Sequence, residues 1–423
     1  MKNNLLLRWS FLVILLTNVS ACAESREVST PTETVVPTRT QTPRPTAVLP
    51  ISTSTPAMTS WANEACWEKQ SLEDANANIA GSLFYLDFQS DEYRLLNLAT
   101  KKTKGTNLFQ KNWWTEVQVS PYGQYFSLLR TNNNEFLLFS ENGGKIFSVP
   151  SKTYFAKYLN NSQILLGYQA TEYQLYVLNP ESGELTTRHI SKPNFPELRC
   201  SFNGFRCNYR YAAFSPDLKH IFYIANGGTN NLLDISSGKL VENKSGGYSF
   251  GNSMSFPNVP FWKLDASAVT IFDSHNYYNI EVDGDFYQLT HLENLFPNGS
   301  YGLLVGKWSP SGRYLAFIVL DSNVALYIFD SYTNALINPC VSENFDGHRH
   351  YWSIFWSPVG NQLALDIGDK GTMAPYGEGY QFVRDEWYKT EIVDLDRQLI
   401  YEVPNTIRNE QQELLGWLSW ETP

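Results

Sequence analysis

The chain alternates between short apolar runs and polar turns over most of its length. One such unit is the run Leu175-Tyr176-Val177-Leu178, which is followed by the turn Asn179-Pro180-Glu181-Ser182-Gly183. Proline early in a turn and glycine at its end favour a type I geometry. Runs of about four to eight apolar and aromatic residues between such turns are typical of β-strands. A helix is predicted only over Asn409–Leu414, so the pattern predicts an all-β protein.

One turn recurs with a regular spacing. Its successive prolines are Pro121, Pro216, Pro310 and Pro358, so each of the first two intervals is near twice the third. Degenerate copies fill the two long gaps, at Leu159–Ser162 and Leu264–Ser267. The four clear copies, each a Ser-Pro-x-Gly phrase or a variant of it before an apolar strand, are Ser120–Gly123, Ser215–Leu218, Ser309–Gly312 and Ser357–Gly360.

These repeats predict a single β-propeller. A period of about 47 residues, with four short strands in each copy, is the signature of a propeller blade. The first segment, Leu83 to Leu108, supplies only three strands of a blade, and the last, Leu415–Trp420, looks like the missing first strand. Pairing the two ends would close the ring and remove its open edge. We count about seven four-stranded blades, with six or eight left open because two copies are degenerate.

The repeats resemble the WD40-like Ser-Pro-Asp-Gly repeats of the TolB-type β-propellers over most of residues 80–420. The resemblance implies a propeller of a kind that hosts binding scaffolds and hydrolase-associated domains alike. The chain departs from true WD40 proteins, because it contains no Trp-Asp dipeptide. It departs from TolB as well, because no α/β domain is expected before the repeats. We therefore assign residues 61–423 to one propeller domain.

The N-terminal part of the chain differs from the rest. Residues 1–21 combine the basic Lys2 and Arg8 with a short apolar run and small residues, as a secretory signal peptide does. Cys22 follows and makes the segment resemble the lipobox of bacterial lipoproteins, which implies cleavage before Cys22 and acylation at that residue. Residues 22–60 hold this lipidated Cys and a Thr/Pro-rich tether that cannot bury enough apolar surface to fold. The predicted protein is exported and lipid-anchored to the bacterial cell envelope, at the outer face of the membrane or the cell surface.

Composition narrows the class of partner. The chain carries a formal net charge of −10 and no basic cluster, which argues against nucleic acid, because phosphates are bound through Lys and Arg. No later run approaches the roughly 20 apolar residues of a membrane span. Contact with the membrane is therefore predicted through the acyl anchor only.

Four cysteines remain after Cys22, and an even number in an exported chain favours disulfides. Three connectivities are possible. The pair Cys200–Cys207 is favoured because it would close a small loop, which leaves Cys66–Cys340 by elimination. No Cys-x-x-Cys occurs and no His flanks these thiols, so we predict no metal and no cofactor.

The candidate binding site lies on one face of the propeller. In each blade the repeated turns lie at one end, and five insertions should emerge at the other end: 193–209, 242–258, 292–301, 341–351 and 368–387. Long loops on a rigid scaffold concentrate binding residues. Aromatic side chains with polar neighbours suit sugar rings or protein hot spots, and the last two insertions are rich in them. The candidate binding residues are His348, His350, Trp352, Tyr376, Tyr380, Arg384 and Trp387.

Other roles stay open for several of these residues. Trp352 and Trp387 have at least an equal claim to be core side chains of strands. Asp346, His348 and His350 have side chains that ligate metals, but no second pair supports a metal site. The phrase Gly247–Gly251 matches the nucleophile elbow of hydrolases, yet it lacks the strand–turn–helix context which that motif needs.

The sequence therefore favours a scaffold that binds a protein or a glycan through its insertion-bearing face. One alternative is a propeller hydrolase acting on carbohydrate or peptide, with carboxylates across the central pore. Another is a structural subunit of an envelope assembly. Binding is favoured over catalysis, and no catalytic residue is assigned.

Overall fold

The computed structural model describes twenty-one stretches of the chain between Ser60 and Trp420. All of them lie in the unit Thr55–Pro423. Within these stretches no helix is long and apolar enough to cross a membrane. The described residues are 60–62, 65–75, 79–87, 90, 92–106, 115–130, 135–140, 144–149, 153–168, 174–189, 212–224, 230–241, 260–272, 275–296, 301–320, 323–344, 350–369, 373–376, 379–382, 387–404 and 412–420.

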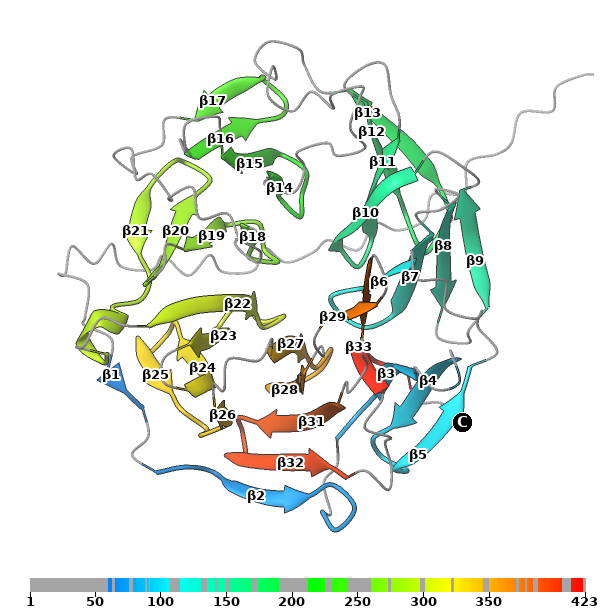
Figure 1. Cartoon of the computed structure of the whole chain (residues 1–423). Helices are drawn as coiled ribbons and strands as arrows, with labels where there is room; N and C mark the ends of the chain where they lie inside the picture. Colours follow the sequence, from blue (N-terminus) through cyan, green and yellow to red (C-terminus); the bar gives the residue numbers. More distant parts are fainter. Residues whose placement is uncertain are drawn as a thin grey trace, which may run out of the picture. The chain divides into compact units, whose positions relative to one another are not determined.

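Seven sheets are arranged in a ring, and each sheet is one blade built around four antiparallel strands (Figure 1). The inner strand of each blade lies toward the middle of the ring, and the outer strand lies toward the rim. The predicted all-β propeller is confirmed, with seven blades rather than six or eight. A short 3-10 helix, η2 (Leu292–Asn294), follows blade 5.

The first four blades each run from an inner strand to an outer strand in chain order, except that the inner strand of blade 1 comes from the far end of the chain. Blade 1 contains β33 (Gln412–Leu418), β3 (Ser82–Asp87), β4 (Glu92–Asn97) and β5 (Lys102–Gly105). Blade 2 contains β6 (Thr115–Val119), β7 (Tyr125–Arg130), β8 (Glu135–Ser140) and β9 (Lys145–Val149). Blade 3 contains β10 (Thr153–Asn160), β11 (Gln163–Tyr168), β12 (Gln174–Leu178) and β13 (Leu185–His189). Blade 4 contains β14 (Ala212–Phe214), β15 (His220–Ile224), β16 (Asn230–Asp234) and β17 (Lys239–Val241).

The remaining blades follow the same plan. Blade 5 contains β18 (Phe261–Trp262), β19 (Ala268–Phe272), β20 (Tyr277–Glu281) and β21 (Phe286–Gln288). Blade 6 contains β22 (Gly302–Trp308), β23 (Tyr314–Leu320), β24 (Asn323–Asp330) and β25 (Ala335–Ile337), and β26 (Ser342–Asn344) also pairs with β24. Blade 7 contains β27 (His350–Trp356), β28 (Gln362–Asp369), β31 (Trp387–Asp394) and β32 (Leu399–Val403).

The serine of the repeated Ser-Pro-x-Gly turn accepts the hydrogen bonds that close the turn. In blade 6 the Ser309 hydroxyl accepts a hydrogen bond from the Tyr314 N–H at 3.0 Å, and the Gly312 N–H donates to the Ser309 carbonyl at 2.9 Å. Gly312 has a φ of 72°, a conformation that favours glycine. The same position in blades 4 and 5 holds Leu218 and Ala266, with φ of 56° and 60°. The turns of these two blades therefore keep the same backbone without a glycine, at a cost of about 1 kcal/mol each.

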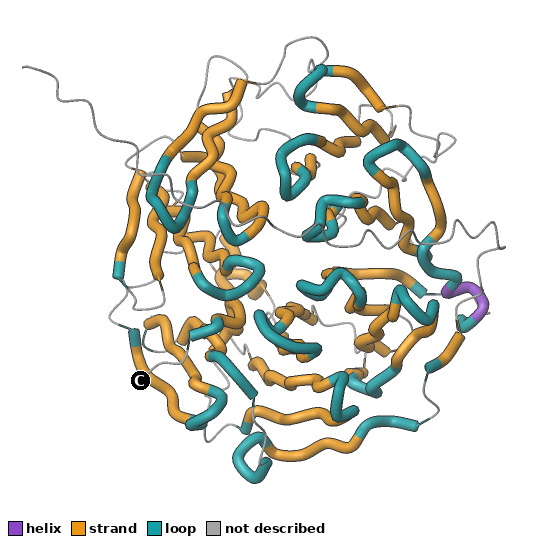
Figure 2. The backbone as a smooth tube through the Cα atoms, turned by 180° about the vertical axis from the view of Figure 1, so that it is seen from behind, coloured by secondary structure: helices purple, strands orange, loops and turns teal. Residues whose placement is uncertain are grey.

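These turns define two faces of the ring. One side of the ring holds the turns between inner and second strands and those between third and outer strands, and we call it the turn face. We call the opposite side the insert face. Figure 2 shows the turns in teal, gathered around the middle and along the rim. Hydrogen bonds link neighbouring turns, because the Tyr122 N–H donates to Asn161 Oδ1 at 3.1 Å and Asn160 Nδ2 donates to the Pro216 carbonyl at 2.8 Å. The turn face is thus tied together from blade 2 to blade 4.

Apolar side chains fill the junctions between blades. One cluster of buried residues lies between each pair of neighbouring blades around the ring. Between blades 1 and 2, Phe126 packs between Phe84 and Phe139, and each ring centroid lies 4.8 Å from that of Phe126. Because a blade buries both of its faces, its strands can be apolar at successive positions, and β3 is buried at every residue.

The ring closes by pairing strands from opposite ends of the described chain. Strand β33 pairs with β3 in antiparallel register, with Leu418 opposite Ser82 and Gln412 opposite Asp87. The buried Ser82 hydroxyl donates to the Trp420 carbonyl at 2.7 Å. The predicted closure is confirmed. The helix predicted over Asn409–Leu414 is wrong, because the chain from Gln412 alternates between buried and half-buried residues, which is the period of a strand.

Residues 60–75, which we call the belt, run outside blades 6 and 7 at the rim (Figure 1). Strand β1 (Ser60–Trp61) pairs in parallel with β25, and β2 (Glu68–Ser71) pairs in parallel with β32. Lys69 Nζ lies 2.9 Å from the buried carboxylate of Glu391 on β31. The belt covers backbone groups that an outer strand would otherwise expose. The sequence does not predict it, because its strands are too short to show a pattern.

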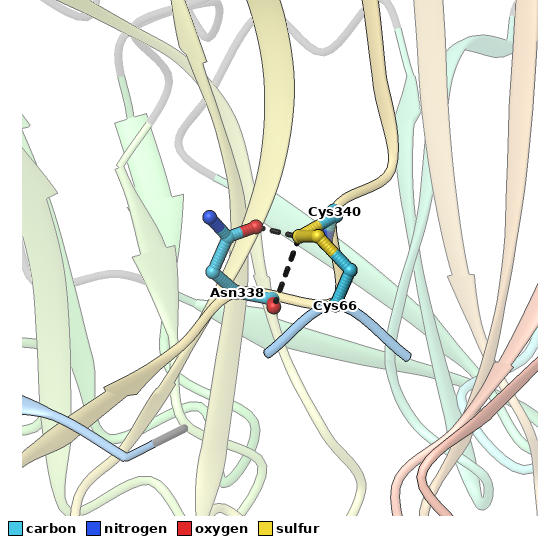
Figure 3. Close-up of a disulfide and its surroundings, with 3 residues drawn as sticks. All are labelled: Cys66, Asn338 and Cys340. Carbon is cyan, nitrogen blue, oxygen red and sulfur yellow. Dashed lines mark hydrogen bonds between the residues drawn. A yellow bond between two sulfur atoms is a disulfide. The ribbon is translucent and has the colours of Figure 1, made fainter. Parts of the chain in front are cut away.

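A disulfide between Cys66 and Cys340 fastens the belt to blade 6 (Figure 3). The two Cα atoms are 5.2 Å apart, and 274 residues separate the cysteines in sequence. Cys340 lies between β25 and β26, where its N–H donates to Asn338 Oδ1 at 2.8 Å. Cys200 and Cys207 lie outside the described residues, so their pairing stays a prediction.

The closing strand offers a sharp test of the packing. A Cβ atom at Gly416 would lie 2.3 Å from Val119 Cγ2 of blade 2, whereas a Cβ atom at Gly302 on β22 would have no neighbour within 4 Å. We expect Gly416→Ala to lower the free energy of unfolding by about 1–3 kcal/mol through overpacking, measured by urea denaturation. Gly302→Ala is the matched control and should change it by less than about 0.5 kcal/mol. Adding Val119→Ala to Gly416→Ala should restore part of the loss, and a double variant less stable than Gly416→Ala would contradict this account.

Candidate functional site

The insertion predicted between the second and third strands of blade 7 is present. Strand β28 ends at Asp369 and β31 begins at Trp387, and the two pair along their whole length. Between them, β29 (Met373–Tyr376) pairs with β30 (Gly379–Phe382) as a separate hairpin. In the view of Figure 1, β29 is drawn over the inner part of the ring rather than at its rim. The connection from a second to a third strand lies on the insert face, so the hairpin belongs to that face.

Backbone register brings several of the predicted binding residues to one end of blade 7. Asp369 on β28 is opposite His350 on one side and opposite Trp387 on the other. Tyr376 and Tyr380 occupy the neighbouring hairpin, where Tyr380 is opposite Pro375. His350, Trp387, Tyr376 and Tyr380 therefore belong to elements that meet at the insert face of this blade. His348, Arg384 and the predicted lipidation site Cys22 lie outside the described residues.

Trp352 lies in the core. Its side chain is 7% exposed and packs in the cluster between blades 6 and 7, with Ile354 and Val324 among the members. This is the core role that the sequence left open for it. Its indole Nε1 is buried and has no acceptor among the described residues. The Trp352 ring therefore packs between blades 6 and 7 and is not presented at the insert face.

Side chains of the inner strands form a second region, where neighbouring blades contact each other. In five blades, an equivalent pair of facing residues on the inner and second strands lies next to the repeated turn. The inner-strand residues that come one position before these pairs are Gln118, Lys157, Phe261, Lys307 and Phe355. These residues occupy the same place in five different blades, and we call their level the cation level. The pairs that follow them are Val119–Phe126, Tyr158–Ile164, Trp262–Val269, Trp308–Leu315 and Trp356–Leu363.

Two side chains at the cation level each donate a hydrogen bond to the inner strand of the next blade. Lys307 Nζ donates to the Ile354 carbonyl of the next blade at 2.7 Å, and Gln118 Nε2 donates to the Ala156 carbonyl of its next blade at 2.8 Å. Lys307 Nζ also lies 4.5 Å from the centroid of the Phe355 ring, a cation–π distance. Side chains at this level therefore link blade 2 to blade 3 and blade 6 to blade 7.

Both lysines lie in surroundings that disfavour their charge. Lys307 has solvent-accessible surface, yet protein closely surrounds its ammonium group, and this desolvation lowers the pKa of Lys307 to about 8. Desolvation also lowers the pKa of Lys157. The sequence carries one signal for Lys157 and Lys307, because each lysine precedes the repeated turn of its blade by the same number of residues.

Carboxylates that are buried in the described residues have structural partners. Asp366 accepts from the Thr390 hydroxyl at 2.8 Å and from the Leu414 N–H at 3.0 Å, which ties blade 7 to blade 1. Asp330 forms two hydrogen bonds with Arg313, at 3.0 and 2.6 Å, within blade 6. In the described stretches, no three His, Cys, Asp or Glu side chains gather in a way that could hold a metal ion. Asp366 and Asp330 are therefore both engaged in contacts that hold the fold together.

Comparisons with known proteins give structural neighbours only. No protein-family model matches the chain, and no curated protein matches it. One similar solved structure is the β-propeller domain of Myceliophteria thermophila Cps50 (Swd1), at 13% identity and a TM-score of 0.39, covering 68% of this chain and 93% of that one. Another is a protein from Agrobacterium tumefaciens assigned as TolB, at 16% identity and a TM-score of 0.33, covering 63% of this chain and 89% of that one. The fold assignment rests on the strand pairing of the chain itself.

The environment of Lys307 predicts an unusual reactivity. An amine with a pKa of about 8 has a neutral fraction near pH 7.5 that is about a hundredfold larger than that of an ordinary lysine. We expect acylation of Lys307 by a small reagent to rise with a midpoint near pH 8, followed peptide by peptide with mass spectrometry from pH 6.5 to 10. Unfolding the protein in urea should move this midpoint up toward about 10.4. A midpoint above pH 10 in the folded protein would contradict the described environment.

Proposed function

We propose that this chain is an exported, lipid-anchored protein whose seven-bladed propeller binds a protein or a glycan through its insert face. The observation that carries the proposal is the hairpin β29–β30, which rises from blade 7 and interrupts an otherwise regular ring. A rigid ring that displays added segments on one side is suited to recognition.

The strands beneath the hairpin support this role. β28 and β31 have 8 residues each, whereas β15 and β16 of blade 4 have 5 each. His350 and Trp387 are both opposite Asp369, the residue at which β28 ends before the hairpin. Aromatic residues beside polar ones are the usual composition of protein hot spots and of sugar-binding surfaces.

The place where the chain enters the ring also fits a tethered scaffold. Ser60, at the start of the belt, lies on the outer strand of blade 6, at the rim (Figure 1). A tether formed by residues 22–59 would therefore join the propeller at its edge. The Thr/Pro-rich composition of that segment favours an extended chain of up to about 3.1 Å per residue.

The anchor is tested at Cys22. Because acylation requires the thiol, Cys22→Ser should release the protein from the membrane fraction into the soluble extracytoplasmic fraction, measured by fractionation and immunoblotting. Mass spectrometry of the N-terminal peptide should show acyl chains on wild type and none on the variant. Cys66→Ser is the matched control, because it removes a cysteine whose sulfur is held in the disulfide with Cys340, and it should remain in the membrane fraction. An unmodified Cys22 in a membrane-bound wild type would contradict the lipid anchor.

The binding face is tested by removing the hairpin. Residues 370–386 are replaced by a short Gly/Ser turn, which keeps the pairing of β28 with β31. We expect crosslinking in intact cells, followed by purification and mass spectrometry, to capture a partner on wild type and to lose it on this variant. Tyr332→Ser is the control, since Tyr332 is 75% exposed on the turn face.

Each outcome of the hairpin experiment separates the candidate functions. A protein partner lost with the hairpin supports a protein-binding scaffold, and a glycan found in carbohydrate arrays and lost with the hairpin supports a glycan-binding one. Turnover of a glycan or peptide that survives hairpin removal favours the hydrolase. Subunits that co-purify with both the wild type and the hairpin variant favour a structural subunit of an assembly.

A further inference from the structure

A cavity of about 330 Å³ lies at the outer part of blade 6, beneath the belt. The Cys66–Cys340 disulfide and Asn338, which are drawn in Figure 3, form part of its wall. Cys66, Asn323 and Ser342 line it and are exposed, so the cavity is open to solvent. Asn323 is the first residue of β24, which follows the connection from second to third strand, so the cavity lies toward the insert face.

Strand register places the cavity on one face of the blade 6 sheet. Asn323, Ala325 and Tyr327 alternate along β24, so their side chains share a face. Val319 on β23 and Ser342 on β26 are the two residues opposite Ala325, and they lie on the same face. Val319 and Tyr327 pack in the cluster between blades 5 and 6, so this face is the one turned toward blade 5.

Two features of the sequence leave this space unfilled. The large side chains of Phe329 and Tyr327 are followed on the same face by the small one of Ala325, with the small Ser342 opposite it. The outer edge of β24 is covered first by β25 and then by β26. The chain between these two strands is longer than the part of β24 beside it, so it must bulge outward, and Cys340 in that bulge has a φ of 65°.

The wall of the cavity is polar but carries no charged side chain. Its polar groups are the amides of Asn323 and Asn338 and the hydroxyl of Ser342, and Val319 and Ala325 supply apolar surface. Within the described part of the chain, neither the Asn323 amide nor the Ser342 hydroxyl makes a side-chain hydrogen bond. An amide offers both donors and an acceptor, which matches ligand hydroxyl groups, because these also donate and accept. An ion would find no counter-charge here.

An aromatic cluster adjoins the same wall. The ring of Tyr327, which lines the cavity, lies 5.8 Å from that of Trp61 and 5.5 Å from that of Phe296, measured between centroids. Trp61 belongs to the belt and is 42% exposed. An aromatic surface beside uncharged amides and hydroxyls suits a sugar ring, whose C–H groups pack on apolar surface while its hydroxyls reach polar partners.

We propose that this cavity binds a neutral sugar ring, with hydroxyl groups of the sugar hydrogen-bonded to Asn323 and Ser342. The volume is at the lower end of the range for small-molecule sites, roughly 300–1,000 Å³, so it suits a single ring. Ala325 leaves the space that the ring occupies, and Tyr327 closes one side of it.

This inference goes beyond the proposed function, because the cavity belongs to blade 6 and the belt, whereas the proposed binding segment is the hairpin of blade 7. The two can fail separately. A full chain in which residues 370–386 are replaced by the Gly/Ser turn should lose the partner and still bind the sugar. Sugar binding that is lost with the hairpin and unchanged by substitutions in the cavity would support the proposed function and overturn this inference.

The test measures binding of glucose, galactose, mannose and N-acetylglucosamine to the full chain by saturation-transfer difference NMR, with glucuronate as the charged comparison. A sugar ring has about a dozen non-hydrogen atoms, so we expect a Kd in the millimolar range for the best neutral sugar and weaker binding of glucuronate. The best sugar is then titrated as its methyl glycoside. Equal or tighter binding of the glycoside identifies the end of a glycan chain, and weaker binding identifies a free monosaccharide.

Two substitutions test the site itself. Ala325→Leu fills the cavity and should raise the Kd by about tenfold or more, because the ring and the leucine side chain would compete for one space. Asn323→Ala removes one amide from an exposed position, so the fold should survive, and it should raise the Kd by about tenfold. Circular dichroism checks the fold of both variants.

Asn231→Ala is the matched control, because it removes the same amide from the third strand of blade 4, β16, away from the cavity. It should leave the Kd within about twofold of wild type. The proposal is overturned if no neutral sugar binds, if glucuronate binds as tightly as the best neutral sugar, if a folded Ala325→Leu or Asn323→Ala variant binds like wild type, or if Asn231→Ala weakens binding as much as Asn323→Ala does.

Discussion

Closure of the ring by β33 and β3 is the constraint on which the rest of the structure depends. Each blade can bury both of its faces only if it has a neighbour on both sides, and a row of seven blades would leave two apolar faces in water. Pairing Gln412–Leu418 with Ser82–Asp87 removes both open faces at once. The contact of Gly416 with Val119 shows how closely blade 1 then packs on blade 2. The two faces of the ring are consequences of that closure.

The sequence predicts those parts of the fold that repeat. Turns closed by Ser309 and its equivalents are local, so their chemistry is written in a few adjacent residues. Spacing between copies then predicts about seven blades, and the structure decides the number, with Leu218 and Ala266 in the place of glycine in two of the turns. The belt is different, because β1 and β2 are stabilised by β25 and β32, which come from the opposite end of the chain, and nothing in their own short sequence reports that pairing.

Prediction of the candidate site follows the same division. The position of the hairpin is predictable, because an insertion that interrupts a repeat must lie between known strands. The burial of Trp352 is not, since an aromatic residue on a strand reads the same whether it faces a neighbouring blade or a ligand. Lys157 and Lys307 escape attention in sequence because they are isolated charges that lie far apart along the chain, and only the register of the inner strands places them at one level.

Reinforcement of the ring is concentrated where its regularity is broken. Blades 6 and 7 carry the belt, the Cys66–Cys340 disulfide and the long strands β24, β28 and β31. Strand β1 adds to the rim of blade 6 and β2 to the rim of blade 7, and the disulfide at Cys340 fixes the belt to blade 6 covalently. The two long strands of blade 7 that flank the hairpin therefore belong to a sheet whose outer edge is covered by β2. The insertion thus interrupts the repeat in the part of the ring where additional pairing and a covalent bond hold neighbouring blades together.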